Sequence, residues 1–167
     1  PASQALRRDG AQAGDLIYVT GQLGDAGVGL QLALARCELT LEPTRRDYFI
    51  SRLERPTPRI AAGLALRSLA TAAIDISDGL AGDLGHILTA SGVGATLNVD
   101  ALPVAAEVKA LSQEWWWLPL TAGDDYELCW VIKGKLELIL PNEKHILGTG
   151  DSIQFDAVLQ HSYKTLK

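Results

Sequence analysis

The clearest change of hydrophobic pattern along the chain lies near its middle. Thr71–Ile76 is a short apolar segment that favours a strand, and the polar turn Ser77–Gly79 interrupts it. Apolar residues then return with the spacing of one helical face, at Leu80, Leu84, Ile87 and Leu88. Ser77 or Asp78 is suited to cap this helix, and Gly92 is suited to end it. The pattern predicts a strand, a tight turn and a helix.

Further elements follow from the same rules on both sides of this unit. Short or alternating apolar runs predict strands at Asp15–Thr20, Ala95–Val99, Tyr126–Ile132, Leu136–Leu140, Lys144–Leu147, Ser152–Phe155 and His161–Thr165. Helical spacing predicts helices at Val28–Glu38, Arg45–Glu54, about Ile60–Leu69 and Pro103–Leu111. Thr44 is expected to cap the second of these helices, and Pro56 or Pro58 to open the third. The predicted elements therefore mix strands and helices up to Ile132 and are strands alone after it.

Two carboxylates, Asp75 and Asp78, lie at the central strand–helix junction beside the Ser77 hydroxyl. Amides at the start of a helix attract anions, and paired carboxylates suit magnesium that bridges a protein to nucleotide phosphates. The alternative is that Asp78 only caps the helix and that Asp75 is a solvated strand end. The glycine-rich stretch Gly21–Gly29 is a second candidate for phosphate binding, although close packing explains its glycines equally well.

Length and composition describe a folded chain. Its 167 residues suit about one domain, and 47% hydrophobic with 21% charged residues argues against disorder. A net charge of −5 disfavours nucleic-acid binding, and no apolar run approaches the length of a membrane span. Cys37 and Cys129 lie in apolar stretches, which suggests buried thiols in a reducing compartment, although a disulfide is the alternative. We expect a cytoplasmic protein with no nucleic-acid or membrane partner. Of the consecutive indoles Trp115, Trp116 and Trp117, at least one should be exposed.

Composition changes sharply near Lys133. Every arginine lies between Arg7 and Arg67, whereas five of the six lysines lie from Lys133 onward. The chain has no methionine and begins at Pro1, which is typical of a piece of a longer or processed product. We expect two segments of different origin, residues 1–132 and residues 133–167.

Four ordered motifs resemble the C-terminal domain of thiamine-monophosphate kinase, namely GDLIYVTGQLGDAGVGLQLAL, RPTPRI, AIDISDGLAGDLGHIL and AGDDYELCW. That family belongs to the superfamily of aminoimidazole ribonucleotide synthetase, and the likeness runs from Pro1 to about Ile132. It implies an α/β (α+β) fold with a mixed sheet flanked by helices, to which antiparallel strands are added at the C-terminal end. It also implies a kinase that uses magnesium and ATP to convert thiamine monophosphate into thiamine diphosphate.

The resemblance also assigns individual residues. It implies that Asp75 and Asp78 bind magnesium, that Ser77 and Arg8 contact the nucleotide, and that Asp124 helps to hold the thiamine substrate. The family usually has glutamate at the last place, so the shorter carboxylate weakens the expectation of substrate binding. A further glycine of the family is replaced by alanine just before the Gly-Asp-Asp turn.

An N-terminal domain supplies most of the magnesium aspartates in that family and forms the usual dimer. The 167 residues contain no counterpart of it, and phosphoryl transfer depends on positioning and charge neutralisation. We therefore expect no measurable kinase activity from this chain alone, no complete catalytic set, and weakened or lost magnesium binding.

The tail from residue 133 onward resembles part of a cupin barrel of the kind attached to bacterial transcription regulators. The signal is GTGDSIQF followed by His161, and it covers about half of such a domain. His145 stands alone and His86 lies on the central helix, so a transition-metal site lacks ligands and structural roles are expected. Half a barrel leaves strand edges open, so we expect the tail to cap the kinase-like sheet or to pair with another chain in a homo-oligomer.

These features together favour a chimera, artificial or recombined, of an inactive kinase fragment and a cupin-like segment. The fragment is expected to retain at most weak magnesium–nucleotide binding. The alternatives are a non-catalytic engineered fold and a small-molecule-binding cupin-like protein.

Overall fold

The computed structural model describes residues 5–37, 39–110, 117–148 and 162–166. In chain order its elements are β1 (Leu16–Val19), α1 (Asp25–Ala33), α2 (Pro43–Glu54), α3 (Ile60–Ala65), β2 (Ala70–Ile76), α4 (Leu80–Ser91), the 3-10 helix η2 (Val99–Ala101), α5 (Ala106–Lys109), α6 (Leu118–Thr121), β3 (Glu127–Ile132), β4 (Lys135–Ile139), β5 (Lys144–Leu147) and β6 (Ser162–Leu166). The described strands form two three-stranded sheets.

The first sheet has the order β1–β3–β2, and its central strand is antiparallel to both neighbours. β3 reads ELCWVI and is buried along almost its whole length, as suits a strand covered on both faces. Trp130 of β3 lies opposite Tyr18 on one side and Ala73 on the other. The α+β class is confirmed, but the described strand pairs are all antiparallel, whereas a mixed sheet was expected. β1 and β2 run in the same direction yet never meet, because β3 separates them.

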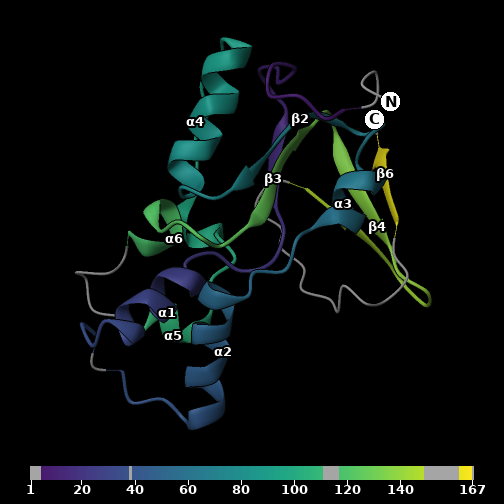
Figure 1. The fold of residues 1–167 in the computed structure, drawn as a ribbon. Helices are drawn as coiled ribbons and strands as arrows, with labels where there is room; N and C mark the ends of the chain where they lie inside the picture. Colours follow the sequence, from purple (N-terminus) through teal and green to yellow (C-terminus); the bar gives the residue numbers. More distant parts are fainter. Residues whose placement is uncertain (1–4, 38, 111–116, 149–161, 167) are drawn as a thin grey trace.

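Helix α4 covers one face of this sheet (Figure 1). The predicted helical stripe is buried there, with Leu80, Leu84 and Ile87 packed against Ile76 and Cys129. The helix ends as predicted at Gly92, which has a left-handed φ of 68°. The end of β2 and the start of α4 thus form a fixed strand–turn–helix unit.

The tail forms the second sheet, in the order β5–β4–β6, which lies on the other side of the first sheet (Figure 1). Trp130 and Leu136 share one apolar cluster, and the ring of Tyr163 lies 6.3 Å from that of Trp130. The hydroxyl of Tyr18 donates to the carbonyl oxygen of Leu147 at 2.9 Å. These contacts place the described part of the tail against the face of the first sheet that carries Trp130. The predicted strand Ser152–Phe155 lies outside the described residues.

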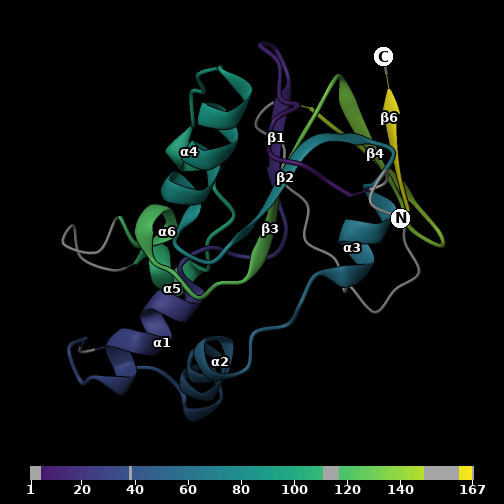
Figure 2. The same ribbon diagram turned by 45° about the horizontal axis from the view of Figure 1, so that its top comes forward.

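A group of helices, α1, α2, α5 and α6, lies beyond the end of the first sheet where β2 stops (Figures 1 and 2). Val28 and Leu32 of α1 pack against Phe49 of α2. Gly29 makes this approach possible, because a Cβ at that position would lie 2.2 Å from the carbonyl oxygen of Phe49. Close packing therefore accounts for part of the glycine-rich stretch.

Several element boundaries differ from the sequence predictions. The expected strand Ala95–Val99 is absent, and the Asn98 side chain instead accepts a hydrogen bond from the amide of Asp100, which favours the local turn η2. α1 begins earlier than expected, at Asp25, because a left-handed Gly24 precedes it.

The remaining differences concern helix ends. α2 begins at Pro43 with no side-chain cap, so Thr44 is not its N-cap. α3 begins after both prolines of the preceding linker, with Arg59 at the N-cap position. Of the helix expected at Pro103–Leu111, the described part contains only the short α5.

Both cysteines are free thiols, Cys37 partly buried and Cys129 buried, so the disulfide alternative is wrong for this structure. Cys129 is buried, and burial raises the pKa of its thiol to about 12. No helix among the described residues has the length and apolar character needed to cross a membrane.

Candidate functional site

The candidate site begins where β2 ends. Asp75 and Asp78 are exposed, and neither carboxylate has a hydrogen bond or an ion pair within the described residues. Asp83, buried in the first turn of α4, accepts hydrogen bonds through Oδ2 from the amides of Ser77 and Asp78, each at 2.9 Å. Gly79 occupies the N-cap position with a φ of 100°. The prediction of Ser77 or Asp78 as the cap is wrong, because Asp83 orders this turn from inside the helix.

The two free carboxylates fit part of a magnesium site. Magnesium prefers oxygen ligands and is commonly held by one or two carboxylates together with water and substrate phosphates. No cluster of three or more potential ligand side chains is found in the part of the chain that the structure describes. Asp75 and Asp78 therefore suit one side of a shared site better than a closed protein cage.

A second turn, Gly123–Tyr126, lies directly beside the first. The amide of Asp124 donates to the carbonyl oxygen of Ser77 at 2.9 Å, and the amide of Tyr126 donates to that of Ile76 at 2.8 Å. Asp124 and Tyr126 have φ values of 66° and 49°, a conformation that is uncommon for residues other than glycine. At Gly123 a Cβ would lie 2.6 Å from the Ser77 carbonyl oxygen. We call Ser77–Gly79, which follows Asp75, the carboxylate turn and Gly123–Tyr126 the acidic turn. Main-chain contacts thus hold the exposed Asp124 of the acidic turn beside the carboxylate turn.

Between the two left-handed residues lies Asp125, whose side chain is buried. Its Oδ2 accepts a hydrogen bond from the amide of Gly24 at 2.7 Å, and its Oδ1 accepts one from Ala26 at 3.1 Å. Burial raises the pKa of Asp125 to about 6; the negative charge of Asp25 adds to this, while the two amides and the charge of Arg52 oppose it.

These amides belong to the N-terminal end of α1, where the glycine-rich stretch was a candidate phosphate site. A carboxylate of the chain itself already binds them. The structure therefore supports the packing explanation of the glycines over the phosphate explanation.

Asp25 is also buried, next to this contact. Its Oδ2 accepts a hydrogen bond from the hydroxyl of Tyr48 at 2.5 Å, and its Oδ1 has no partner within the described residues. Burial raises the pKa of Asp25 and, together with the hydrogen bond to Asp25, that of Tyr48. Two buried carboxylates, from α1 and from the acidic turn, therefore lie close to one another.

Glu127 completes the buried charges at the start of β3. It accepts hydrogen bonds from Arg59 at 2.5 and 2.6 Å, from Arg52 at 2.7 Å and from the Thr20 hydroxyl at 2.5 Å. Glu127 pairs with Ile76 in the sheet, one residue before the carboxylate turn. The two arginines thereby fix α2 and the linker before α3 to the strand end that carries the site.

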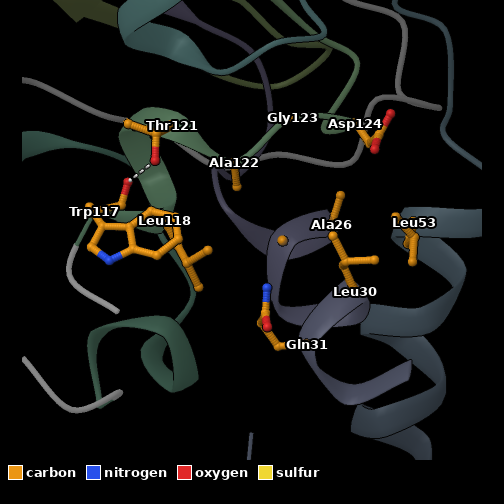
Figure 3. Close-up of a pocket in the computed structure, with 11 residues that line it drawn as sticks. Ala26, Leu30, Gln31, Leu53, Trp117, Leu118, Thr121, Ala122, Gly123 and Asp124 are labelled. Carbon is orange, nitrogen blue, oxygen red and sulfur yellow. Dashed lines mark hydrogen bonds between the residues drawn. The ribbon is translucent and has the colours of Figure 1, made fainter. Parts of the chain in front are cut away.

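A pocket of about 210 Å³ opens between α1 and the segment around α6 (Figure 3). Its lining includes Gln31 on α1, Leu53 on α2, Trp117 before α6, and Asp124 at one edge (Figure 3). Trp117 is 37% exposed, which agrees with the expectation for the consecutive indoles; Trp115 and Trp116 lie outside the described residues. The pocket combines an aromatic ring, an amide and a carboxylate.

A second pocket, of about 440 Å³, is lined by residues of the linker before α3, of β2 and of the start of β3. Pro56, Ile60 and Tyr126 form apolar walls, and Asp75 lies at this pocket as well. Asp75 and Asp124 therefore line different pockets.

The structure brings together four of the five predicted site residues, namely Asp75, Ser77, Asp78 and Asp124. Arg8 lies elsewhere: its carbonyl oxygen accepts a hydrogen bond from Ser91 at the C-terminal end of α4. The 12 residues of α4 span about 18 Å between that end and the turn. The nucleotide role of Arg8, like the roles of the other four residues, stays a prediction.

Sequence patterns missed three residues that shape the site, namely Asp83, Asp125 and Glu127. Asp125 and Glu127 could have been noticed as acids that flank an otherwise apolar strand, and Asp83 as an acid in the first turn of a helix. Of the histidines, His86 is exposed on α4 and His145 lies on β5. His161 lies outside the described residues.

The fold and the site together define an α+β domain whose central sheet presents two acidic turns side by side. Residues 12–131 match the family described as AIR synthase related protein, C-terminal domain, and the chain belongs to this family. The thiamine-monophosphate kinase of Salmonella typhimurium is 50% identical over 135 residues, which cover 79% of this chain and 41% of that kinase. The Escherichia coli K12 kinase is 44% identical over 148 residues, covering 84% and 45%.

Solved structures agree with this assignment. Thiamine-monophosphate kinase from Stenotrophomonas maltophilia K279a aligns with a TM-score of 0.68 at 44% identity, covering 77% of this chain and 42% of that one. AaThiL complexed with AMPPCP and TMP aligns with a TM-score of 0.67 at 36% identity, covering 76% and 42%. The chain thus spans about two fifths of the kinases it matches. The family match ends at residue 131, so the likeness of the tail to a cupin stays a prediction.

Proposed function

We propose that residues 1–132 act as the C-terminal part of an ATP-dependent thiamine-monophosphate kinase and contribute one side of its active site. Asp75 and Asp78 would hold magnesium, Ser77 would contact the nucleotide, and Asp124 would contact thiamine monophosphate. The observation that carries this proposal is the pair of hydrogen bonds from the amides of Asp124 and Tyr126 to the carbonyl oxygens of Ser77 and Ile76. They hold Asp124 beside Ser77, so that the proposed substrate and cation ligands would be neighbours. Similarity to kinases, one of them solved with AMPPCP and TMP, supports it.

The buried aspartates suggest how phosphate would be recognised. The amides at the start of α1 bind Asp125, and the amides that precede α4 bind Asp83. Because these amides are already bound, nucleotide phosphates would bind this chain chiefly through a cation held by Asp75 and Asp78. Magnesium, when bound, supplies charge neutralisation for the transferred phosphoryl group.

The pocket beside Asp124 suits a flat organic cation such as thiamine. The indole of Trp117 offers an aromatic face, and Gln31 offers a polar amide. The carboxylate of Asp124 lies at the edge of the pocket, where it would form an ion pair with the positively charged thiazolium ring. Apolar side chains of α1, α2 and the segment around α6 line the rest of the pocket, as in most small-molecule sites.

Activity is expected to need more than these residues. The described part offers two carboxylates, Asp75 and Asp78, that could bind magnesium and no cluster of three or more potential ligands, whereas phosphoryl transfer depends on metal ions that neutralise the developing charge. We therefore expect the purified chain to produce no measurable thiamine diphosphate from ATP and thiamine monophosphate. Turnover above a boiled control in a coupled assay for ADP would contradict this expectation.

Calorimetric titration with magnesium and ATP tests the cation side. We expect weak, magnesium-dependent binding that falls at least about tenfold when Asp75→Asn and Asp78→Asn are combined, since two charge-assisted contacts are lost. Asp47→Asn combined with Asp100→Asn, two exposed carboxylates on α2 and η2, removes the same charge and should leave binding unchanged. Equal losses in both double variants would show a general charge effect and count against the site.

Titration with thiamine monophosphate, monitored through tryptophan fluorescence, tests the proposed substrate contact of Asp124. Asp124→Asn should weaken binding, and Asp124→Glu should strengthen it, because glutamate restores the longer carboxylate that the related kinases usually carry. Identical affinities for all three chains would remove Asp124 from the proposed site.

One observation favours a second candidate, a non-catalytic chimera whose tail is a cupin-like cap. The family match ends at residue 131, and the tail that follows forms a sheet of its own. In that case residues 1–132 and 133–167 have separate origins, and the chain is a stable fold that assembles with itself or binds a small molecule through the tail. Absence of any nucleotide or thiamine binding, together with an oligomer in sedimentation, would favour this candidate.

A further inference from the structure

Asp125 links the acidic turn to helices α1 and α2 through its side chain and its main chain. Its carboxylate binds the amides of Gly24 and Ala26 at the start of α1, at 2.7 and 3.1 Å. Its carbonyl oxygen accepts a hydrogen bond from Arg52 of α2 at 3.0 Å. A single residue therefore holds the acidic turn against two helices.

The neighbours of Asp125 extend this connection to β2. Asp124 and Tyr126 each donate an amide hydrogen bond to the end of β2, at Ser77 and Ile76. Both residues are in left-handed conformations, which persist where surrounding contacts impose them. The contacts of Asp125 with α1 and α2 add to the contacts that impose this conformation on the turn.

Helix α1 is also a wall of the pocket beside Asp124. Ala26 and Gly27 line the pocket, whereas Asp125 does not. The distance between this wall and the Asp124 carboxylate is therefore set by a residue that would not touch the ligand.

We propose that Asp125 is a positioning residue, whose ionised side chain locks the start of α1 to the acidic turn and so fixes Asp124 relative to both the pocket and the carboxylate turn. The locking is a property of the chain itself. Its effect on ligand binding rests on the proposed function.

The electrostatics of the site agree with a functional role. Burial raises the pKa of Asp125 to about 6, so ionisation at neutral pH is costly at this place. The charged groups around it are Asp25 of α1, Arg52 of α2 and Glu127 of β3, with Asp124 beside it in the turn. Buried carboxylates with a raised pKa are more typical of functional sites than of residues that serve stability alone.

Amide chemical shifts of the ¹⁵N-labelled full chain test the locking without any ligand. In the wild type, the amides of Gly24 and Ala26 should move together between about pH 5 and about pH 7.5, with one midpoint near the pKa of Asp125. The amide of Asp124 should follow the same midpoint. In Asp125→Asn this transition should disappear, while Asp100→Asn, the same change at an exposed site, should keep it.

Two results would overturn the proposal. The first is a wild-type chain in which the amides of Gly24 and Ala26 do not titrate in this interval. The second is an Asp125→Asn chain in which the Asp124 and Ser77 signals stay at their wild-type positions. If Asp125→Asn does not fold, the wild-type titration alone decides.

Thiamine monophosphate binding then tests the functional part. Asp125→Asn should weaken binding on the order of tenfold at neutral pH, the scale of one lost hydrogen bond to a charged group, although Asp124 is intact. Unchanged affinity would show that the lock does not serve this ligand. A wild-type chain that binds no thiamine monophosphate, yet shows the common amide titration, would contradict the proposed function and leave the locking intact.

Discussion

At the scale of single residues, the candidate site depends on buried acids that lie behind exposed ones. Asp75, Asp78 and Asp124 face solvent, while Asp83 and Asp125 hold their turns by accepting backbone hydrogen bonds. Asp75 and Asp78 were predictable because they lie in a local strand–turn–helix pattern, and Asp124 was proposed because the motif AGDDYELCW resembles that of thiamine-monophosphate kinase. The contact of Asp125 was not, because its partners on α1 lie about one hundred positions earlier in the chain.

The raised pKa of Asp125 makes a prediction for stability. Between about pH 4 and about pH 6 the folded chain retains a proton on Asp125 that the unfolded chain has released. The contribution of this group to the free energy of unfolding therefore falls as pH rises through that interval, by about 3 kcal/mol, and is constant above it. Asp25 acts in the same direction, since its pKa is raised too.

Urea unfolding of the wild type and of Asp125→Asn at several pH values measures this contribution. The stability of the variant relative to the wild type should increase as pH rises from about 4 to about 6. A difference that is independent of pH would mean that the carboxyl group is not buried as described.

Glu127 gives a second prediction at this scale. Glu127→Gln removes the negative charge between Arg52 and Arg59 and leaves two partly buried guanidinium groups without it. We expect a loss of about 3 kcal/mol or more in the free energy of unfolding, measured by urea denaturation. Glu107→Gln, which breaks the more exposed pair with Arg45, should lose at most about 1 kcal/mol. Similar losses in the two variants would contradict the structural role of Glu127.

At the scale of elements, sequence periodicity predicted those pieces whose pattern is local. α4 has the apolar stripe and the Gly92 terminus expected of it, and β3 coincides with an apolar run that was predicted as a strand. Ala95–Val99 had the alternation of a strand, but it finds no partner strand, and the hydrogen bond within the Asn98 turn prevails. Partner availability is a property of the whole fold, so alternation alone could not decide this segment.

The contact between α1 and α2 can be tested at Gly29. Gly29→Ala should destabilise the chain by about 2 kcal/mol, because the added methyl group would overlap the main chain of Phe49. Gly82→Ala is a suitable control on the exposed side of α4, where no atom lies within 4 Å of the added Cβ. That variant should be more stable by up to about 1 kcal/mol through helix propensity alone. Thermal unfolding followed by circular dichroism measures both, and a neutral Gly29→Ala would contradict the close packing.

At the scale of the whole molecule, two antiparallel sheets stack through side chains of β3 and of the tail. The family match stops near the end of β3, yet Trp130, Leu136 and Tyr163 belong to one apolar cluster. A tail packed in this way completes the burial of a sheet face that would otherwise contact water. The sequence suggested a second segment that either caps the sheet or pairs with another chain, but which sheet face it covers could only come from the structure.

This stacking predicts that the two sheets unfold together. Leu136→Ala should lower the free energy of unfolding by about 3 kcal/mol, since Leu136 is buried between the sheets. Far-ultraviolet circular dichroism and tryptophan fluorescence should report the same transition. Ile146→Ala, at an exposed position of β5, should change stability by no more than about 0.5 kcal/mol. Separate transitions for the two probes would show that the tail is an independent unit.

The two acidic turns are joined by hydrogen bonds between peptide groups, from the amides of Asp124 and Tyr126 to the carbonyl oxygens of Ser77 and Ile76. The side chains of Ser77 and Asp124 do not take part in those bonds, so a substitution that tolerates the local φ leaves the link between the two turns in place. A protein built in this way can alter the ligand it prefers through single mutations while its architecture is conserved.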